Sequence, residues 1–335
     1  MADRQTAVFA LHPHLLPDIF PAALVERLRH SVDIDPTAVL TSLDTAADRN
    51  LLSRADILLT GWGCPRLDAA ALSHAGRLRA VLHAAGSVKG HTTPALFEAG
   101  VTVSSAVHVN ARPVAEFTVA AIVFGTKRVF SHAAAYRAGN PTVGYPANED
   151  TGVAGSTVGV IGASRIGRLV LRLLAAYDVR CLVHDPFLDP GEAADLGAEP
   201  VGLDELCRRS DVVTVHAPDL PETRGMIDER RLGLMRDGAV LVNTARGTLV
   251  DTEALTAHCA RGRLDAVLDV TDPEPLPPDH ELLRLPNVLV TPHLAGARGR
   301  ELPAFGEFVV SEVERLVAGD PLAGRVELAD LNRIA

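Results

Sequence analysis

Short apolar runs alternate with segments of helical periodicity through the first hundred residues. The apolar runs lie at residues 7–11, 56–60, 78–84 and 101–104, and the helical segments include residues 21–30, 67–75 and 92–99. Strands that alternate with crossover helices form parallel sheets. The pattern therefore predicts an α/β domain at the start of the chain.

A long, mostly apolar helix is expected at residues 114–129, and a polar stretch with little periodicity, residues 132–155, follows it. A long apolar helix followed by such a polar stretch indicates a boundary between two domains. A second alternation then begins, with strands expected at 157–161, 179–184, 212–216, 239–243, 266–270 and 288–290 and helices at 165–177, 203–210 and 252–261. This half is predicted to be a doubly wound sheet. The last helix, residues 300–318, has no predicted strand after it and is expected to pack on the first domain.

Composition narrows the classes of function. The 335 residues include 32 Lys and Arg against 42 Asp and Glu, a formal net charge of −10, and 47% of the residues are hydrophobic. A negative field repels nucleic acid and anionic membrane surfaces. We therefore expect a folded protein, with neither nucleic acid nor a membrane as partner.

The spacing of the cysteines and the length of the apolar runs argue against a metal-binding, a membrane-spanning or a secreted protein. Cys64, Cys181, Cys207 and Cys259 lie far apart without a C-x-x-C pair, so no metal site is expected and the thiols should be reduced and mostly buried. The longest apolar run after the first strand, residues 117–124, is far shorter than the ~18–20 residues of a membrane span. The first apolar stretch is too brief for a signal sequence. A cytoplasmic location is expected.

The expected strand at 157–161 is followed at once by the sequence GASRIG, residues 162–167, and a helix. This is the context of a dinucleotide-binding loop, in which a helix N-terminus faces a pyrophosphate. Gly162 would permit the tight turn and Gly167 the close packing of helix on strand, while Ser164 stands at the middle glycine position. Asp185 follows the next strand, where a carboxylate would accept hydrogen bonds from ribose hydroxyls and repel a phosphate, which favours NAD over NADP. An ordinary glycine-containing turn is the alternative.

Three polar residues follow strands in the second half of the chain. They are Arg246, Glu274 and His293. Ligands bind beyond the carboxyl ends of the strands in open α/β sheets, so these side chains are expected to converge. The planar guanidinium group of Arg can bind a carboxylate through two N–H groups. An imidazole beside a carboxylate can hold a proton and deliver it to a ligand. Taken one at a time, a solvated Arg, a surface Glu and a structural His are the alternatives.

The chain resembles the D-isomer-specific 2-hydroxyacid dehydrogenases, which reduce 2-keto acids with a nicotinamide cofactor. The resemblance rests on VAE at 114–116, GASRIG with Asp185, HAP at 216–218, NTARGTLVD at 243–251, the segment from Asp269 to Pro275, and TPH at 291–293. It implies a Rossmann-type cofactor domain, residues 113–296, inserted in a flavodoxin-like substrate domain made of residues 1–112 and 297–335. It also implies an active site in the cleft between the two and a homodimer formed through the long helix and the 132–155 stretch.

The resemblance assigns roles to the polar residues. Arg246 would bind the substrate carboxylate and C2 oxygen, His293 would protonate that oxygen, and Glu274 would keep His293 protonated. Asp269 would support the nicotinamide side. The expected cofactor-binding residues are Gly162, Ser164, Arg165, Ile166, Gly167, Asp185, His216, Thr244, Ala245, Asp269 and Gly296.

In the first domain, the segment Ala85, Gly86 and Ser87 follows a strand, at the position where the family binds the substrate carboxylate with backbone N–H groups. A plain strand-to-helix turn is the alternative. Trp62 could form a wall of the substrate pocket or belong to the core. Two departures bear on substrate choice: Phe117 stands where relatives often carry His, and Ser87 where Gly is usual.

The sequence thus predicts an NAD-dependent 2-keto acid reductase with a small carboxylate substrate such as glyoxylate or hydroxypyruvate. Glu274 in place of Gln argues against the formate-oxidising branch. Two alternatives stay open. One is a dehydrogenase of the same fold that acts on an oxyanion or phosphonate, and the other is a corepressor-like protein that senses NADH.

Overall fold

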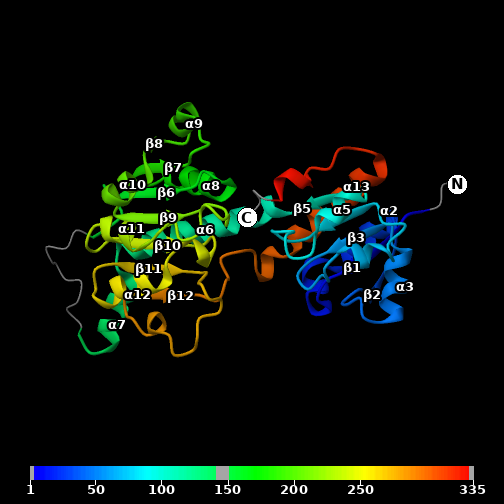
Figure 1. The fold of residues 1–335 in the computed structure, drawn as a ribbon, viewed down its shortest axis with the longest axis horizontal. Helices are drawn as coiled ribbons and strands as arrows, with labels where there is room; N and C mark the ends of the chain where they lie inside the picture. The colour runs from blue at the N-terminus through cyan, green and yellow to red at the C-terminus, as the bar shows by residue number, and fades with distance from the viewer. Residues whose placement is uncertain (1–3, 141–150, 332–335) are drawn as a thin grey trace. The chain divides into compact units, whose positions relative to one another are not determined.

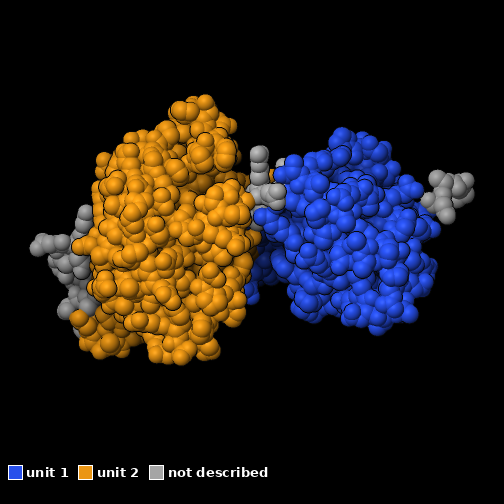
Figure 2. Space-filling view, viewed as in Figure 1, with its two compact units in different colours: residues 1–110, 297–334 blue, residues 111–296, 335 orange. Residues whose placement is uncertain are grey.

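The chain folds into two compact units in the computed structural model, which describes residues 4–140 and 151–331. Unit 1 comprises Met1–Asn110 and Ala297–Ile334, and unit 2 comprises Ala111–Gly296 (Figure 2). The first division falls inside helix α6 (Val107–Thr126), the same helix in which the sequence placed its boundary.

Unit 1 is built on a six-stranded sheet in the order β13-β5-β4-β3-β1-β2. Its strands are β1 (Thr6–Ala10), β2 (Asp33–Val39), β3 (Ile57–Thr60), β4 (Ala80–His83), β5 (Thr102–Ser105) and β13 (Arg325–Val326). Strands β1 to β5 pair in parallel, in the strand order of flavodoxin-like sheets. The helices are α1 (Leu16–Ile19), α2 (Ala22–Ser31), α3 (Ala46–Arg54), α4 (Ala69–Leu72), α5 (Pro94–Glu98) and α13 (Pro303–Ala318).

Helices cover both faces of this sheet. Consecutive strand residues point to opposite faces, so Leu59 packs in one cluster with Phe305 of α13, and Leu58 packs in the other with Leu52 of α3. The prediction that the last helix packs on the first domain is therefore confirmed. The prediction that no strand follows it is wrong, because β13 pairs antiparallel with β5. A strand of two residues is too short to leave a periodic signal.

Unit 2 is built on a seven-stranded parallel sheet in the order β12-β11-β10-β9-β6-β7-β8, visible in Figure 1. Its strands are β6 (Thr157–Ile161), β7 (Arg180–His184), β8 (Ala198–Pro200), β9 (Val212–Val215), β10 (Val240–Asn243), β11 (Asp265–Leu268) and β12 (Val288–Val290). The helices besides α6 are α7 (Val129–Arg137), α8 (Arg165–Leu174), α9 (Pro190–Asp195), α10 (Leu203–Arg209), α11 (Glu229–Leu234) and α12 (Thr252–Ala260). This is the Rossmann strand order, extended by one strand.

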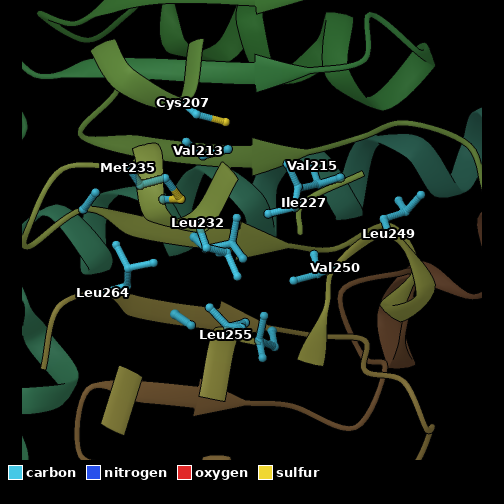
Figure 3. Packing of buried hydrophobic residues seen from close by; sticks show 14 of the residues in the cluster. Cys207, Val213, Val215, Ile227, Leu232, Met235, Leu249, Val250, Leu255 and Leu264 are labelled. Atoms are coloured by element: carbon cyan, nitrogen blue, oxygen red, sulfur yellow. The ribbon is translucent and has the colours of Figure 1, made fainter. Parts of the chain in front are cut away.

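The core of unit 2 explains why its strands form continuous apolar runs. On one face, Val213 and Val215 of β9 pack with Leu232 of α11 and Leu255 of α12 (Figure 3). On the other face, Val242 of β10 belongs to a cluster that α6 and α8 cover. Strands covered on both faces need apolar side chains on both. The predicted class, two doubly wound parallel-sheet α/β domains, is confirmed.

The long central helix differs from its prediction. Helix α6 begins at Val107, earlier than the predicted residue 114, and continues through Pro113. Proline removes one helical hydrogen bond, which is why the pattern indicated a start after it. Helix α7 occupies part of the stretch 132–155 that the sequence left without structure, and residues 141–150 of that stretch lie outside the described residues.

All four cysteines are free, two buried and two half-buried. Within residues 4–140 and 151–331, no helix combines the length and apolar character that crossing a membrane requires.

Candidate active site

The loop after β6 is shaped by two glycines. Gly162 has φ +91°, and a Cβ there would lie 2.7 Å from the backbone nitrogen of Ala217. A Cβ on Gly167 would lie 2.0 Å from the carbonyl oxygen of Gly162. Both positions exclude a side chain, because backbone atoms fill the space that it would need. The loop is therefore closed tightly against the segment that follows β9.

Ser164, the departure from the glycine pattern, caps helix α8. Its hydroxyl accepts a hydrogen bond from the N–H of Gly167 at 3.4 Å. Within the described residues, the N–H groups of Ser164, Arg165 and Ile166 donate no hydrogen bond. Unpaired N–H groups at a helix N-terminus attract anions. The loop thus retains the donors that a pyrophosphate needs, with serine in place of the middle glycine.

Asp185 fixes this loop from the end of β7. Its Oδ2 accepts a hydrogen bond from the N–H of Ala163 at 2.7 Å, and its Oδ1 accepts one from the N–H of Phe187 at 2.8 Å. Each carboxylate oxygen has a second lone pair. The half-buried carboxylate therefore orients the loop and can still accept hydrogen bonds from a ligand hydroxyl.

His216 lies behind the loop, directly after β9. Its Cβ is 3.4 Å from the position that a Cβ on Gly167 would take. Its Nε2 is 3.0 Å from the Thr214 hydroxyl, while its buried Nδ1 has no partner within the described residues. Burial lowers the pKa of His216 to about 3, so the ring is neutral at physiological pH.

Arg246 is held in place by the end of β10. The buried Asn243 donates through Nδ2 to the Arg246 carbonyl at 2.8 Å and accepts from the Ala245 N–H at 3.0 Å. Gly247 allows this loop to pack on the loop after β11, since a Cβ on it would lie 2.0 Å from the Thr271 carbonyl oxygen. The backbone around Arg246 is thus fixed by contacts on both sides.

The Arg246 side chain is partly removed from water. One guanidinium nitrogen donates to the Ala245 carbonyl at 2.6 Å. Burial lowers the pKa of Arg246, and the charges of Glu274 and Asp219 raise it. Arginine stays charged even so, and its planar fork has five N–H donors. The group retains donors for a carboxylate or carbonyl oxygen.

Glu274 and His293 form a pair. Oε1 of Glu274 is 2.6 Å from Nδ1 of His293, and the two side chains are 41% and 52% exposed. The backbone of His293 adopts φ +53°, which is uncommon for a residue with a side chain. Because Glu274 occupies Nδ1, the second ring nitrogen is the one that can exchange a proton with a ligand.

Asp269 positions the turn that carries His293. This carboxylate is 2% exposed and accepts hydrogen bonds from the Thr291 hydroxyl at 2.6 Å, the Leu294 N–H at 2.7 Å and the Ala295 N–H at 2.8 Å. Its expected contact with the cofactor stays a prediction. Sequence reasoning missed its bonds to the turn, because no local pattern links residue 269 to residues 291–295.

Thr244 has a partner that the sequence did not reveal. Its hydroxyl is 2.8 Å from that of Thr118 in α6, and Thr118 also donates to the Val114 carbonyl at 2.8 Å. Gly296, also expected near the cofactor, is the last residue of this stretch of unit 2 and is half-buried.

The carboxyl ends of six strands carry the expected site residues of unit 2. Residues 162–167 follow β6, Asp185 follows β7, His216 follows β9, Arg246 follows β10, and Asp269 with Glu274 follows β11; His293 follows the adjacent β12. The strands are parallel neighbours, so these residues share one edge of the sheet. A cavity of about 640 Å³ lies at the opposite edge, lined by residues that include Thr157, Arg180 and Asp211, and none of the expected site residues lines it.

In unit 1, the segment 85–87 follows β4, and two of its carbonyls contact Ser105 of β5. Ser105 of β5 donates to the Gly86 carbonyl at 2.5 Å and contacts that of Ala85 at 3.4 Å. Among the described residues, no acceptor is found for the N–H groups of Ala85, Gly86 and Ser87. Trp62 is 40% exposed and meets Phe305 edge-on, so it is not a buried core residue.

No cluster of three or more His, Cys, Asp or Glu side chains that could hold a metal ion occurs in the part of the chain that the structure describes.

Comparison with known proteins adds the family context. Residues 119–295 match the model of the family described as D-isomer specific 2-hydroxyacid dehydrogenase, NAD binding domain. A D-3-phosphoglycerate dehydrogenase of Mycobacterium tuberculosis is 34% identical over 76% of this chain and 48% of its own length, so the chain spans about half of that relative.

Two further relatives are matched over nearly their whole length. A glyoxylate reductase of Aeropyrum pernix is 34% identical over 84% of this chain and 85% of its own. The crystal structure of the TT0316 protein from Thermus thermophilus superposes with a TM-score of 0.78 at 31% identity, covering 96% of this chain and all of that one.

Proposed function

Because the chain belongs to the D-isomer specific 2-hydroxyacid dehydrogenase family, we propose that it is an NAD-dependent oxidoreductase that interconverts a 2-keto acid and a D-2-hydroxy acid. One observation carries this proposal. A loop suited to a dinucleotide, the partly buried Arg246 and the Glu274–His293 pair share one edge of the unit 2 sheet.

The residues after β6 fit a dinucleotide. Gly162 and Gly167 leave no room for a Cβ, and the N–H groups at the start of α8 are without partners among the described residues. Asp185 can accept ribose hydroxyls and would repel a ribose phosphate, which supports NAD over NADP. When bound, the nicotinamide supplies the hydride, which no side chain can supply.

The chain's own residues supply binding and proton transfer. Arg246 donates to the carboxylate and the C2 oxygen, which holds the carbonyl and stabilises the negative charge that develops on that oxygen. His293 delivers a proton from its second ring nitrogen to the C2 oxygen, and Glu274 stabilises the charged ring from the other side. In the direction of oxidation, neutral His293 accepts the proton.

A small 2-keto acid such as glyoxylate or hydroxypyruvate is the proposed substrate. Its carboxylate would bind the N–H groups of Ala85, Gly86 and Ser87, for which no acceptor occurs among the described residues. Ser105 holds the Gly86 carbonyl, which shares a peptide plane with the Ser87 N–H. Trp62 is exposed enough to contact a substrate side chain.

The test is oxidation of NADH and of NADPH with glyoxylate, hydroxypyruvate, pyruvate, bulkier 2-keto acids and phosphonopyruvate. We expect turnover with NADH. Arg246→Lys and His293→Ala should each lower kcat/KM by on the order of 100-fold or more while the protein stays folded. Arg236→Lys, an exposed arginine paired with Asp211, is the matched control and should be unchanged.

The same panel separates the alternatives. NADH binding without reduction of any acid would contradict the reductase and favour an NADH-sensing protein, and turnover with phosphonopyruvate alone would favour a phosphonate substrate. Wild-type rates in both site variants would contradict the assigned roles.

We further propose a homodimer that acts in the cytoplasm. Phe124 and Tyr136, on α6 and α7, are 48% and 68% exposed, which supports an interface on these helices. Light scattering after size-exclusion chromatography should give twice the mass of one chain, and a single-chain mass would contradict the dimer.

A further inference from the structure

The segment 85–87 leaves the unit 1 sheet just after β4. The backbone hydrogen bonds between this part of the chain and the neighbouring strands β3 and β5 end at His83 and Ala84. Beyond them, no backbone group donates to the carbonyl of Ala85 or of Gly86 within the described residues. The sheet therefore does not determine how the peptide planes of this segment are oriented.

Side-chain packing does not fix Gly86 either. Among the described residues other than its chain neighbours, a Cβ on Gly86 would meet one atom within 4 Å, Nδ2 of Asn110 at 3.5 Å, which is an ordinary contact. Glycine has more accessible backbone conformations than any other residue. The peptide planes on both sides of Gly86 can therefore rotate unless another group binds them.

Ser105, the last residue of β5, binds both of these peptide planes. Its hydroxyl donates to the Gly86 carbonyl at 2.5 Å and lies 3.4 Å from the Ala85 carbonyl oxygen. The same hydroxyl accepts a hydrogen bond from the Val107 N–H at 3.2 Å. A hydroxyl has a single proton to donate, and an N–H can only donate to it. The proton of Ser105 is therefore directed to the two carbonyls.

Ser105 is itself fixed by its surroundings. The residue is fully buried, and its N–H donates to the Gly324 carbonyl at 2.9 Å, directly before β13. Gly324 allows this close approach, since a Cβ on it would lie 2.5 Å from the Ser105 carbonyl oxygen. The hydroxyl that binds the two carbonyls therefore belongs to a residue whose own backbone is held in the sheet.

The bonds from Ser105 also orient N–H groups. The peptide bonds 85–86 and 86–87 are trans, so each carbonyl lies in one plane with the N–H of the next residue and points the opposite way. The Ala85 carbonyl thus orients the Gly86 N–H, and the Gly86 carbonyl orients the Ser87 N–H. Both N–H groups point away from Ser105, and neither has an acceptor among the described residues. Successive N–H groups that point the same way form a site for an anion.

We propose that Ser105 is a positioning residue, which binds the carbonyls of Ala85 and Gly86 so that the N–H groups of Gly86 and Ser87 are held ready for the substrate carboxylate. This inference rests on the proposed function, because it takes the ligand of the segment to be a 2-keto acid. Ser105 acts through the backbone of the segment and does not touch substrate. Its contribution is pre-organisation, which lowers the cost of ordering the segment when the substrate binds.

The neighbouring Ser104 supplies a matched control. It is also a fully buried serine of β5, but its hydroxyl donates to the buried carboxylate of Glu312 in α13. Ser104→Ala removes a hydrogen bond to a charged group, whereas Ser105→Ala removes bonds between neutral groups, which contribute less to stability. Ser104→Ala should therefore lose at least as much stability as Ser105→Ala, although it removes no bond to the segment 85–87.

Each protein is measured for stability in urea, for NADH affinity, for KM and kcat with the 2-keto acid that the wild type reduces fastest, and for inhibition by oxamate, a carboxylate that is not reduced. Ser105→Ala should raise KM and the oxamate inhibition constant about three- to tenfold, the effect of one hydrogen bond. Its kcat and NADH affinity should stay within about twofold, because only binding of the carboxylate is weakened. Ser104→Ala should have the KM and the oxamate inhibition constant of the wild type.

Unchanged KM and oxamate inhibition in Ser105→Ala would overturn the positioning role while leaving the proposed reaction intact. Equal increases in both alanine variants would overturn it too, because the effect would then follow stability and not the segment 85–87. If the wild-type protein neither reduces a 2-keto acid nor binds oxamate, the proposed function itself fails, and the positioning role fails with it. If Ser105→Ala does not fold, Ser105→Cys, whose thiol is only a weak donor, replaces it with the same expected result.

Discussion

Replacing Asp269 by Asn probes how the turn that carries His293 is held. The carboxylate accepts three hydrogen bonds, one at Oδ2 from the N–H of Ala295 and two at Oδ1. An asparagine of the same shape has only one acceptor oxygen. In its best orientation the oxygen keeps the two bonds of Oδ1, and the amide nitrogen faces the Ala295 N–H.

The size of the expected loss of stability follows from the burial of the Ala295 N–H. Ala295 is 4% exposed, so water cannot replace the lost acceptor. A hydrogen bond to a charged group contributes about 1.5–3 kcal/mol, and a buried N–H left unsatisfied costs about 1–3 kcal/mol. These two values describe the same lost hydrogen bond and are not added. We therefore expect Asp269→Asn to lower the free energy of unfolding by about 3 kcal/mol. Because the turn carries His293, kcat should fall as well.

Urea unfolding measures the stability, and steady-state NADH oxidation measures kcat. Asp272→Asn is the matched control, since Asp272 is exposed and lies only a few residues away. A loss of stability below about 0.5 kcal/mol for Asp269→Asn, with NADH affinity alone weakened, would show that this carboxylate does not hold the turn. The carboxylate would then act on the cofactor, as the sequence suggested, and not on the turn.

Three further changes have definite expected outcomes. Gly167→Ala should weaken NADH binding at least about fivefold in a fluorescence titration, because its Cβ would lie 2.0 Å from the Gly162 carbonyl oxygen and overpacking costs about 1–3 kcal/mol. Gly233→Ala, with open space around it, should bind NADH like the wild type, and equal affinities of the two variants would contradict the packing argument. Asp185→Asn keeps an acceptor for the Ala163 N–H but removes the negative charge that would repel a ribose phosphate. The ratio of kcat/KM with NADPH to kcat/KM with NADH should therefore rise by on the order of tenfold. An unchanged ratio would contradict discrimination between the cofactors by charge. Since the folded pKa of His91, about 4, lies below its unfolded value, its contribution to stability is complete above pH 6.5 and is lost as the pH falls toward 4. Buried His83 and His216 lose stability over the same range in both proteins, so between pH 7 and pH 5 we expect His91→Gln to lose about 2 kcal/mol less than the wild type. Identical pH profiles of the two proteins would contradict the assignment.

The sequence predicted the parts of the structure that depend on neighbouring residues. Strand β6 is buried on both faces and therefore forms an unbroken apolar run, and the glycines that close its turn follow directly. Likewise Arg246 and His293 could be placed at strand ends, because each follows such a run.

Contacts between residues far apart in sequence could not be predicted in this way. The hydroxyls of Thr118 and Thr244 meet across 126 positions, and Asp269 bonds to residues 22 to 26 positions later. The cluster of Thr60, His83 and His91 likewise forms only when β3 and β4 pair. Short elements such as β13 were missed for a different reason, since two residues carry no period.

In the proposed reaction, hydride passes from the nicotinamide to C2 of a 2-keto acid bound by this chain. To follow this hydride, NADH that carries deuterium at the transferred position of the ring is mixed with the protein and glyoxylate or hydroxypyruvate, and the products are analysed by mass spectrometry. We predict 2-hydroxy acids with one deuterium at C2, of D configuration in the case of hydroxypyruvate, and no labelled product from His293→Ala. Unlabelled product, or no product from the wild-type protein with any 2-keto acid, would show that this chain does not catalyse the proposed hydride transfer.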